Sequence, residues 1–132
     1  MKTSKIVYLA SLLFLFQLNS TLAQSLDSAT VISVTTFEKM TSKKRNLILD
    51  VRTPEEMAEG YISNASNIDF LDEQFSEQIK DLNKNKTYLL YCRSGKRSAK
   101  AGALMKAAGF KKVYSLDGGI TEWKEEGKPM IK

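Results

Sequence analysis

The chain has 132 residues, a formal net charge of +5, one cysteine and no histidine. This length predicts a single domain. Without histidine the chain cannot build a Ser-His-Asp or Cys-His catalytic site, or a zinc site with histidine ligands. A lone cysteine excludes an internal disulfide, a CxxC redox pair and a cysteine-rich metal cluster. We therefore expect no metal and no cofactor, and a reactive group drawn from Cys92, carboxylates, hydroxyls, lysine or arginine.

The first residues are typical of a secretory signal. A short basic start with Lys2 and Lys5 precedes an apolar run from Ile6 to Leu18, and small residues follow at Thr21 and Ala23. This order predicts a signal peptide that is cleaved after Ala23. The apolar run is shorter than the roughly 20 residues that a membrane-spanning helix needs. An uncleaved anchor and a buried core helix are the alternatives.

The predicted organisation has three segments: a cleaved signal over 1–23, a flexible lead over 24–30 and one domain over 31–132. We expect an exported, periplasmic protein with no stable membrane association after cleavage. Basic residues do not form a stripe with interleaved aromatic side chains, so nucleic acid is not an expected partner. The basic run Lys43 to Arg45 is interpreted as a solvated loop.

The first half of the domain alternates strand and helix signals. Residues 31–34 form a short β-prone run, and Thr35 with Glu38 matches a capping box at the start of a helix whose apolar face carries Phe37 and Met40. Residues 47–51 are almost entirely apolar, as expected for a strand buried on both faces of a parallel sheet.

A second capping box, Thr53 to Glu56, has proline at the first helical position, and Gly60 ends that helix. Residues 65–69 are a weak strand candidate. Phe75, Ile79 and Leu82 share one face of a predicted helix because they are spaced four and three residues apart.

The second half repeats the alternation and ends on a helix. The predicted elements are a strand over 87–91, a helix over 98–108 that stops at Gly109, a strand over 113–116, a turn over 117–119 and a helix over 120–126. Five strands separated by helices predict an α/β fold with a parallel sheet.

Cys92 follows the 87–91 strand and precedes a short glycine-containing loop and a helix. Ligands bind at this end of strands in parallel α/β sheets. Converging backbone N–H groups, the helix dipole and the charges of Arg93, Lys96 and Arg97 favour a thiolate. Such stabilisation matters because no histidine is available to remove the proton. A buried structural cysteine is the alternative, and the three cations in this loop argue against it.

Four segments in matching order resemble the single-domain rhodaneses: Cys92 to Ser98 resembles the active-site loop, Leu49 to Glu56 the strand-to-helix signature, Gly60 to Ala65 the segment after it, and Val113 to Trp123 the C-terminal signature. The resemblance covers essentially residues 30–128. Together with the predicted signal, the chain is most similar to small periplasmic rhodaneses of the phage-shock type.

The resemblance implies a rhodanese-like fold, a five-stranded parallel sheet flanked by helices. It also implies sulfur transfer in which Cys92 attacks an anionic donor such as thiosulfate and the resulting persulfide passes sulfur to cyanide or a thiol. One nucleophile is enough for such a cycle. Arg97 is the first choice for direct contact with the donor. The residues expected to bind substrate are Arg93, Ser94, Gly95, Lys96, Arg97 and Ser98.

The chain departs from the family pattern at Tyr61, where histidine is usual, and at Ser63-Asn64, where Pro-Gly is usual. Because these positions lie outside the sulfur loop, we expect altered loop packing rather than lost chemistry.

Other polar and aromatic residues receive structural interpretations. Asp50 and Arg52 are expected to form an ion pair or turn-anchoring hydrogen bonds, Trp123 to lie in the core, and Glu55-Glu56 and Glu125-Glu126 to face solvent.

Three other functions compete with sulfur transfer. A Cys-dependent phosphatase or arsenate reductase needs an arginine six positions after the cysteine to hold a tetrahedral oxyanion, whereas Ser98 stands there and Arg97 is one position short. A non-catalytic rhodanese-like binding module commonly loses the cysteine, which this chain keeps. A disulfide oxidoreductase is disfavoured because there is no second cysteine to resolve a mixed disulfide.

Overall fold

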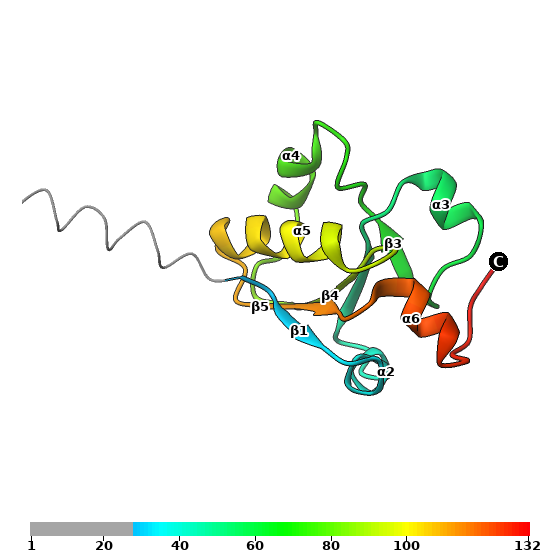
Figure 1. Cartoon of the computed structure of the whole chain (residues 1–132). Coiled ribbons are helices and arrows are strands. Elements are labelled where there is room, and N and C mark those ends of the chain that lie inside the picture. Colours follow the sequence, from blue (N-terminus) through cyan, green and yellow to red (C-terminus); the bar gives the residue numbers. More distant parts are fainter. Residues whose placement is uncertain (1–27) are drawn as a thin grey trace, which may run out of the picture.

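The computed structural model describes residues 28–132 (Figure 1). The predicted signal peptide and most of the predicted lead lie outside these residues. Five parallel strands form one sheet in the order β1-β5-β4-β2-β3, which confirms the predicted fold class. The strands are β1 (Thr30–Ile32), β2 (Leu47–Asp50), β3 (Ala65–Asn67), β4 (Thr87–Tyr91) and β5 (Lys112–Leu116).

Five helices connect and cover the strands: α2 (Val34–Thr41), α3 (Pro54–Ala58), α4 (Phe75–Lys80), α5 (Lys96–Ala107) and α6 (Gly119–Glu125). Each predicted strand and helix is present, with boundaries that differ by a few residues. The first strand starts at Thr30, and Ala29 already packs in the core. No helix within residues 28–132 combines the length and apolar character needed to cross a membrane.

The capping box predicted at Thr35 and Glu38 is wrong. Ser33 caps α2 instead, because its backbone is extended and its hydroxyl accepts a hydrogen bond from the Thr36 N–H at 3.3 Å. Starting the helix at Val34 buries both Val34 and Phe37 against the sheet. The second capping box is confirmed: Thr53 and Glu56 bond reciprocally at the start of α3.

Helix α5 begins at Lys96 rather than at the predicted Ser98. Gly95 occupies its N-cap with φ of 99°, a left-handed conformation that disfavours any residue with a side chain. The segment between β4 and α5 is therefore shorter than predicted, and Lys96, Arg97 and Ser98 belong to the first turn of the helix.

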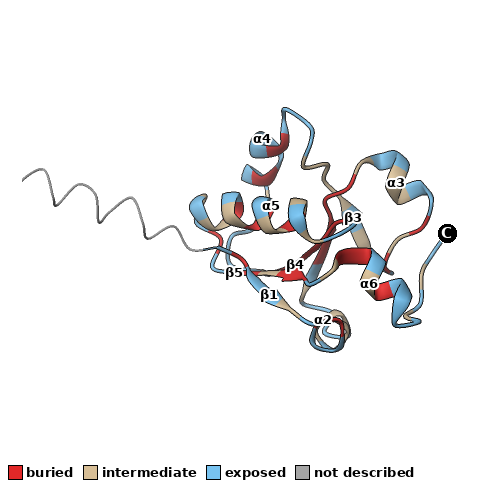
Figure 2. Ribbon diagram, in the orientation of Figure 1, coloured by how far each residue is buried: buried red, intermediate tan, exposed pale blue. Residues whose placement is uncertain are grey.

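The central strand β4 is buried on both faces (Figure 2). Because successive side chains alternate across a strand, Tyr88 and Leu90 pack with α4 and α5 on one face. Leu89 and Tyr91 pack on the other face with Phe37 of α2 and the residues of α6. This two-sided burial explains why the strand is a continuous apolar run rather than an alternating one.

Parallel strands place all their carboxyl ends at one edge of the sheet. Because β4 lies between β2 and β5, the segments that follow these three strands meet there. Residues 51–56, 92–98 and 117–121 therefore come together, although they are far apart in sequence.

Candidate active site

Cys92 follows β4 directly and is buried, with 1% of the residue exposed. The next two residues, Arg93 and Ser94, are exposed, and Gly95 and Arg97 are half-buried. The thiol thus lies at the floor of a short loop whose outer side faces solvent. A reactant must therefore reach the sulfur from the exposed side of this loop.

Backbone N–H groups converge on the sulfur atom. The Gly95 N–H donates to Cys92 Sγ at 3.1 Å and the Ser98 N–H donates at 3.4 Å. Both groups belong to the left-handed turn and the first turn of α5, where N–H groups have no partner within the helix. Donors in this position stabilise negative charge on the sulfur, as the sequence predicted for this loop.

The N-terminus of α6 fastens the loop from the other side. The Ile120 N–H donates to the Cys92 carbonyl at 2.8 Å, and the Thr121 N–H donates to the Arg93 carbonyl at 3.2 Å. Gly119 lies so close that a Cβ there would be 2.4 Å from the Arg93 carbonyl oxygen. The Gly118-Gly119 turn therefore has a direct role in shaping the loop.

Glu56 contradicts its predicted place on a solvated helix face. Its side chain is only 14% exposed, and it accepts hydrogen bonds from both terminal nitrogens of Arg97, at 2.7 Å and 2.8 Å. It also accepts a bond from Arg93 Nε at 3.2 Å. Glu56 becomes the bridge between α3 and the cysteine loop because β2 and β4 are neighbours in the sheet.

These contacts set the charge of the Glu56 carboxyl group. The hydrogen bonds from Arg97, aided by those from Thr53, lower the pKa of Glu56 from 4.5 to about 2. Pairing with Glu56 in turn raises the pKa of Arg97. At neutral pH the pair is ionised, and the carboxylate offsets part of the positive charge that the loop presents.

Asp50 and Arg52 form a buried ion pair, which confirms their structural interpretation. Arg52 Nη2 donates to Asp50 Oδ2 at 2.6 Å and to the Gly60 carbonyl at 2.7 Å. The Tyr91 hydroxyl donates to the same Asp50 oxygen at 2.9 Å and accepts from the Ile62 N–H at 3.1 Å. Burial, reinforced by the Asp50 charge, raises the pKa of Tyr91, so the phenol keeps its proton.

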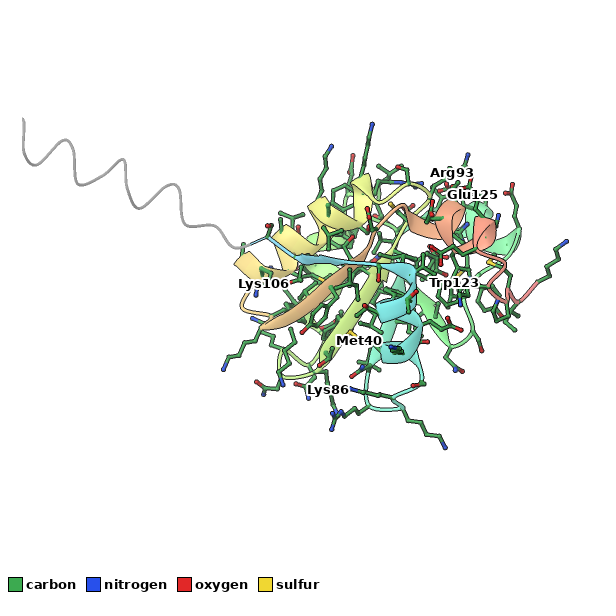
Figure 3. The ribbon with its side chains drawn as sticks, turned by 60° about the horizontal axis from the view of Figure 1, so that its bottom comes forward. Met40, Lys86, Arg93, Lys106, Trp123 and Glu125 are labelled. Carbon is green, nitrogen blue, oxygen red and sulfur yellow. The ribbon has the colours of Figure 1, made fainter. Side chains whose placement is uncertain are left out.

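The predicted substrate-binding residues are adjacent in space but differ in orientation. Arg93 is 63% exposed in its side chain, whereas Arg97 is 22% exposed and directed to Glu56. The Arg93 backbone is bonded to α6 through Thr121, and Figure 3 shows the labelled Arg93 at the opposite side of the molecule from Lys86, which lies at the amino end of β4. Within residues 28–132, no group of three or more acidic or cysteine side chains is placed to hold a metal ion.

Residues at the positions of family departure lie apart from the cysteine loop. Tyr61 pairs with Ile131 through two backbone hydrogen bonds of 2.8 Å each. Ser63 and Asn64 line a cavity of about 260 Å³ with Trp123.

Trp123 itself is buried in the core, as predicted. The exposed positions of Glu55, Glu125 and Glu126 also confirm the prediction for those residues.

The sequence did not predict the contacts of three residues near the loop. These are Glu56 as a partner of Arg97, Tyr91 as a partner of Asp50, and Ser115 as a partner of Ser98. The Ser115 hydroxyl lies 2.7 Å from the Ser98 hydroxyl. A serine inside the otherwise buried end of β5 was an available signal, since an isolated hydroxyl needs a partner when it is buried.

Comparison with solved structures agrees with this architecture. The structure of a rhodanese-related protein from Thermoplasma volcanium aligns with a TM-score of 0.69 and 33% identity, covering 77% of this chain and 97% of that one. A rhodanese-like domain protein from Staphylococcus aureus aligns with a TM-score of 0.64 and 34% identity, covering 78% and 99%.

Sequence relatives include a protein named sulfurtransferase from Allochromatium vinosum, 34% identical over 85 residues, with 64% of this chain and 78% of the relative covered. The chain is also 38% identical to YtwF of Bacillus subtilis over 92 residues, which cover 70% of this chain and 86% of that protein; YtwF carries a provisional sulfurtransferase name. Residues 33–126 match the rhodanese-like domain. Since that match spans most of the sequence and carries the cysteine loop, the chain belongs to the rhodanese-like domain family.

Proposed function

We propose that this protein is a sulfurtransferase that carries a sulfane sulfur on Cys92 as a persulfide. The observation that carries the proposal is the pair of N–H groups, from Gly95 and Ser98, directed at Cys92 Sγ. They stabilise an anionic sulfur without a histidine, which the chain lacks. Relatives named sulfurtransferase support the general reaction class.

The proposed cycle has two displacements. The Cys92 thiolate attacks the outer sulfur of thiosulfate, the sulfur–sulfur bond of the donor breaks, and sulfite leaves with the bonding electron pair. Cyanide or a thiolate acceptor then attacks the outer sulfur of the Cys92 persulfide, and the cysteine thiolate is released. No electron is gained or lost overall, so one cysteine suffices.

The buried position of Cys92 supports a small donor. Thiosulfate presents a single outer sulfur atom, whereas a phosphate ester presents a full tetrahedral group to the nucleophile. The residue six positions after Cys92 is the buried Ser98, and Arg97 is held by Glu56. Neither supplies the arginine that a Cys-dependent phosphatase uses to hold its oxyanion.

The intact mass of the purified protein after incubation with thiosulfate tests the proposal. We expect a gain of one sulfur atom, and its loss with release of thiocyanate when cyanide is added. A parallel incubation with an aryl phosphate should give negligible hydrolysis. A folded protein that gains no sulfur would favour a binding module, and phosphate hydrolysis faster than sulfur transfer would favour the phosphatase.

Export is part of the same proposal. The order of basic, apolar and small residues before Gln24 supports a signal peptide removed after Ala23, a periplasmic location and no stable membrane association of the mature protein. N-terminal sequencing of the protein recovered from the cell envelope should start at Gln24. A membrane-bound chain that still starts at Met1 would contradict cleavage.

Neutralising Glu56 should strengthen binding of an anionic donor. Glu56→Gln removes a negative charge beside Arg97 and Arg93, so the loop becomes more positive by one unit. One charge at roughly 8 Å in water is worth about 0.5 kcal/mol, or about a twofold to threefold lower KM for thiosulfate at low salt. The measurement is a steady-state assay at several salt concentrations. Glu55→Gln, at the exposed neighbour, is the charge-matched control and should change KM less.

The same variant should alter how stability depends on pH. The folded pKa of Glu56, about 2, lies below its ordinary value of 4.5. The ion pair therefore stabilises the fold fully above pH 4.5, and this contribution is lost as the pH falls toward 2. Denaturant unfolding should show a stability difference between the natural protein and Glu56→Gln at pH 7 that shrinks on acidification. A difference that stays constant with pH would contradict this assignment.

A further inference from the structure

Two buried hydroxyl groups lie beneath the cysteine loop. Ser98 is at the first turn of α5 and Ser115 is on β5, and both are essentially inaccessible to solvent. Their oxygen atoms are 2.7 Å apart. Ser98 Oγ is also 3.6 Å from Cys92 Sγ and 3.1 Å from the Gly95 carbonyl oxygen. The mechanism above uses the Ser98 backbone but neither hydroxyl.

Counting protons fixes the direction of the bond between the two serines. Within residues 28–132, Ser115 Oγ has Ser98 Oγ as its only hydrogen-bond partner. If Ser98 donated to Ser115, the Ser115 proton would have no acceptor in a buried site, which is costly. If Ser115 donates to Ser98, both protons are used, because Ser98 has two further acceptors within reach.

The acceptor to which the Ser98 hydroxyl donates its hydrogen bond depends on whether Cys92 is protonated. When Cys92 is protonated, its S–H donates to Ser98 Oγ and the Ser98 hydroxyl donates to the Gly95 carbonyl. When Cys92 is a thiolate, the Ser98 hydroxyl can turn to the sulfur. The Gly95 carbonyl keeps a partner in that state, since it also accepts from the Ala99 N–H at 3.1 Å. When the Ser98 hydroxyl turns to the sulfur, no buried acceptor therefore loses its last hydrogen bond.

We infer that Ser115 is a positioning residue for the nucleophile: it donates to Ser98, so that the Ser98 hydroxyl is free to donate to the Cys92 thiolate. Donation to an ionised acceptor is stronger than donation to a neutral one, so the arrangement stabilises the thiolate more than the thiol. This inference rests on the proposed function only in taking the Cys92 thiolate as the reactive form.

Charged groups are also present on the elements that surround the cysteine loop. They are Arg93 in the loop, Lys96 and Arg97 of α5, Glu56 of α3, Asp69 after β3, Asp117 after β5 and Glu122 of α6. A serine-to-alanine change alters none of these charges. A changed pH response in such a variant therefore reports the hydroxyl groups.

The test is the rate of Cys92 alkylation by iodoacetamide as a function of pH, followed by intact mass. In Ser115→Ala we expect the midpoint of the profile to move up by about half a unit, which is about threefold slower alkylation below the midpoint. Ser98→Ala should shift it at least as far. Because Ser115 acts through Ser98, adding Ser115→Ala to Ser98→Ala should produce no further shift. Ser115→Thr keeps a hydroxyl and should restore the natural profile.

The control for a loosened strand is Val113→Ala, at a buried position on β5 that packs toward α5. It should lower stability without moving the midpoint. Additive shifts in the double variant, an unmoved midpoint in folded Ser115→Ala, or an equal shift in Val113→Ala would each overturn the inference. Alkylation needs no sulfur donor, so this test does not depend on sulfur transfer. If the midpoint shifts in Ser115→Ala but the natural protein never accepts sulfur, Ser115 still positions the thiolate, and only the sulfurtransferase proposal is wrong.

Discussion

Replacing Cys92 with serine should abolish sulfur transfer while leaving the protein folded. A serine hydroxyl does not ionise at neutral pH, so it cannot displace sulfite from thiosulfate, and it cannot hold sulfur as a persulfide. We expect sulfite release to fall by more than about a thousandfold, in the range seen when other enzymes lose their nucleophile. No other residue can replace it, because the chain has one cysteine.

The fold should tolerate this change because serine is small and polar. Its oxygen can still accept from the Gly95 and Ser98 N–H groups that now bond to sulfur. We expect a loss of about 1 kcal/mol in unfolding free energy, measured by denaturant unfolding beside the sulfite assay. Turnover retained in a folded Cys92→Ser protein would remove Cys92 from the role of nucleophile, and activity in the natural protein after complete alkylation of Cys92 would do the same.

Much of the fold could be predicted because its strongest signals are local. The apolar runs at β2 and β4 and the capping box at Thr53 each specify an element without reference to the rest of the chain. The start of α2 was ambiguous because Ser33, Thr35 and Thr36 can all cap a helix. Ser33 is the N-cap because a helix that starts at Val34 buries that residue against the sheet, which is an effect of tertiary packing.

The site was predicted where it depends on one continuous segment and missed where it depends on strand order. Cys92, its loop and the following helix are consecutive, so their relationship follows from the sequence. Glu56 contacts Arg97 only because β2 and β4 are adjacent, and Ser115 reaches Ser98 only because β5 lies on the other side of β4. The strand order is set by packing of the whole sheet, which no local pattern reveals.

Changing Gly119 to alanine should strongly destabilise the fold. The residue has φ of 60°, which costs an L-residue with a side chain about 1–2 kcal/mol. The added Cβ would also lie 2.4 Å from the Arg93 carbonyl oxygen and 2.6 Å from that of Cys92. Backbone atoms cannot turn aside as a flexible side chain can, so the loop or α6 must shift.

That shift breaks the two bonds that fasten the loop, from Ile120 to the Cys92 carbonyl and from Thr121 to the Arg93 carbonyl. We expect a total loss of about 3 kcal/mol, which for a domain of this size lowers Tm by about 15 °C. Sulfur transfer should also fall at temperatures where the variant remains folded, because the N–H groups around Cys92 lose their alignment. Thermal unfolding and the thiosulfate assay measure the two effects.

Gly127 offers a matched control for the cost of placing a side chain at a positive φ. Gly127 has φ of 72°, close to that of Gly119, but a Cβ there would meet nothing within 4 Å. Gly127→Ala should therefore lose only the conformational part, about 1 kcal/mol, with sulfur transfer unchanged. The difference between the two variants isolates the contact between the Gly119 backbone and the cysteine loop. Equal losses of stability would mean that the loop yields freely to the extra carbon, and that α6 does not hold the Cys92 and Arg93 carbonyls in place.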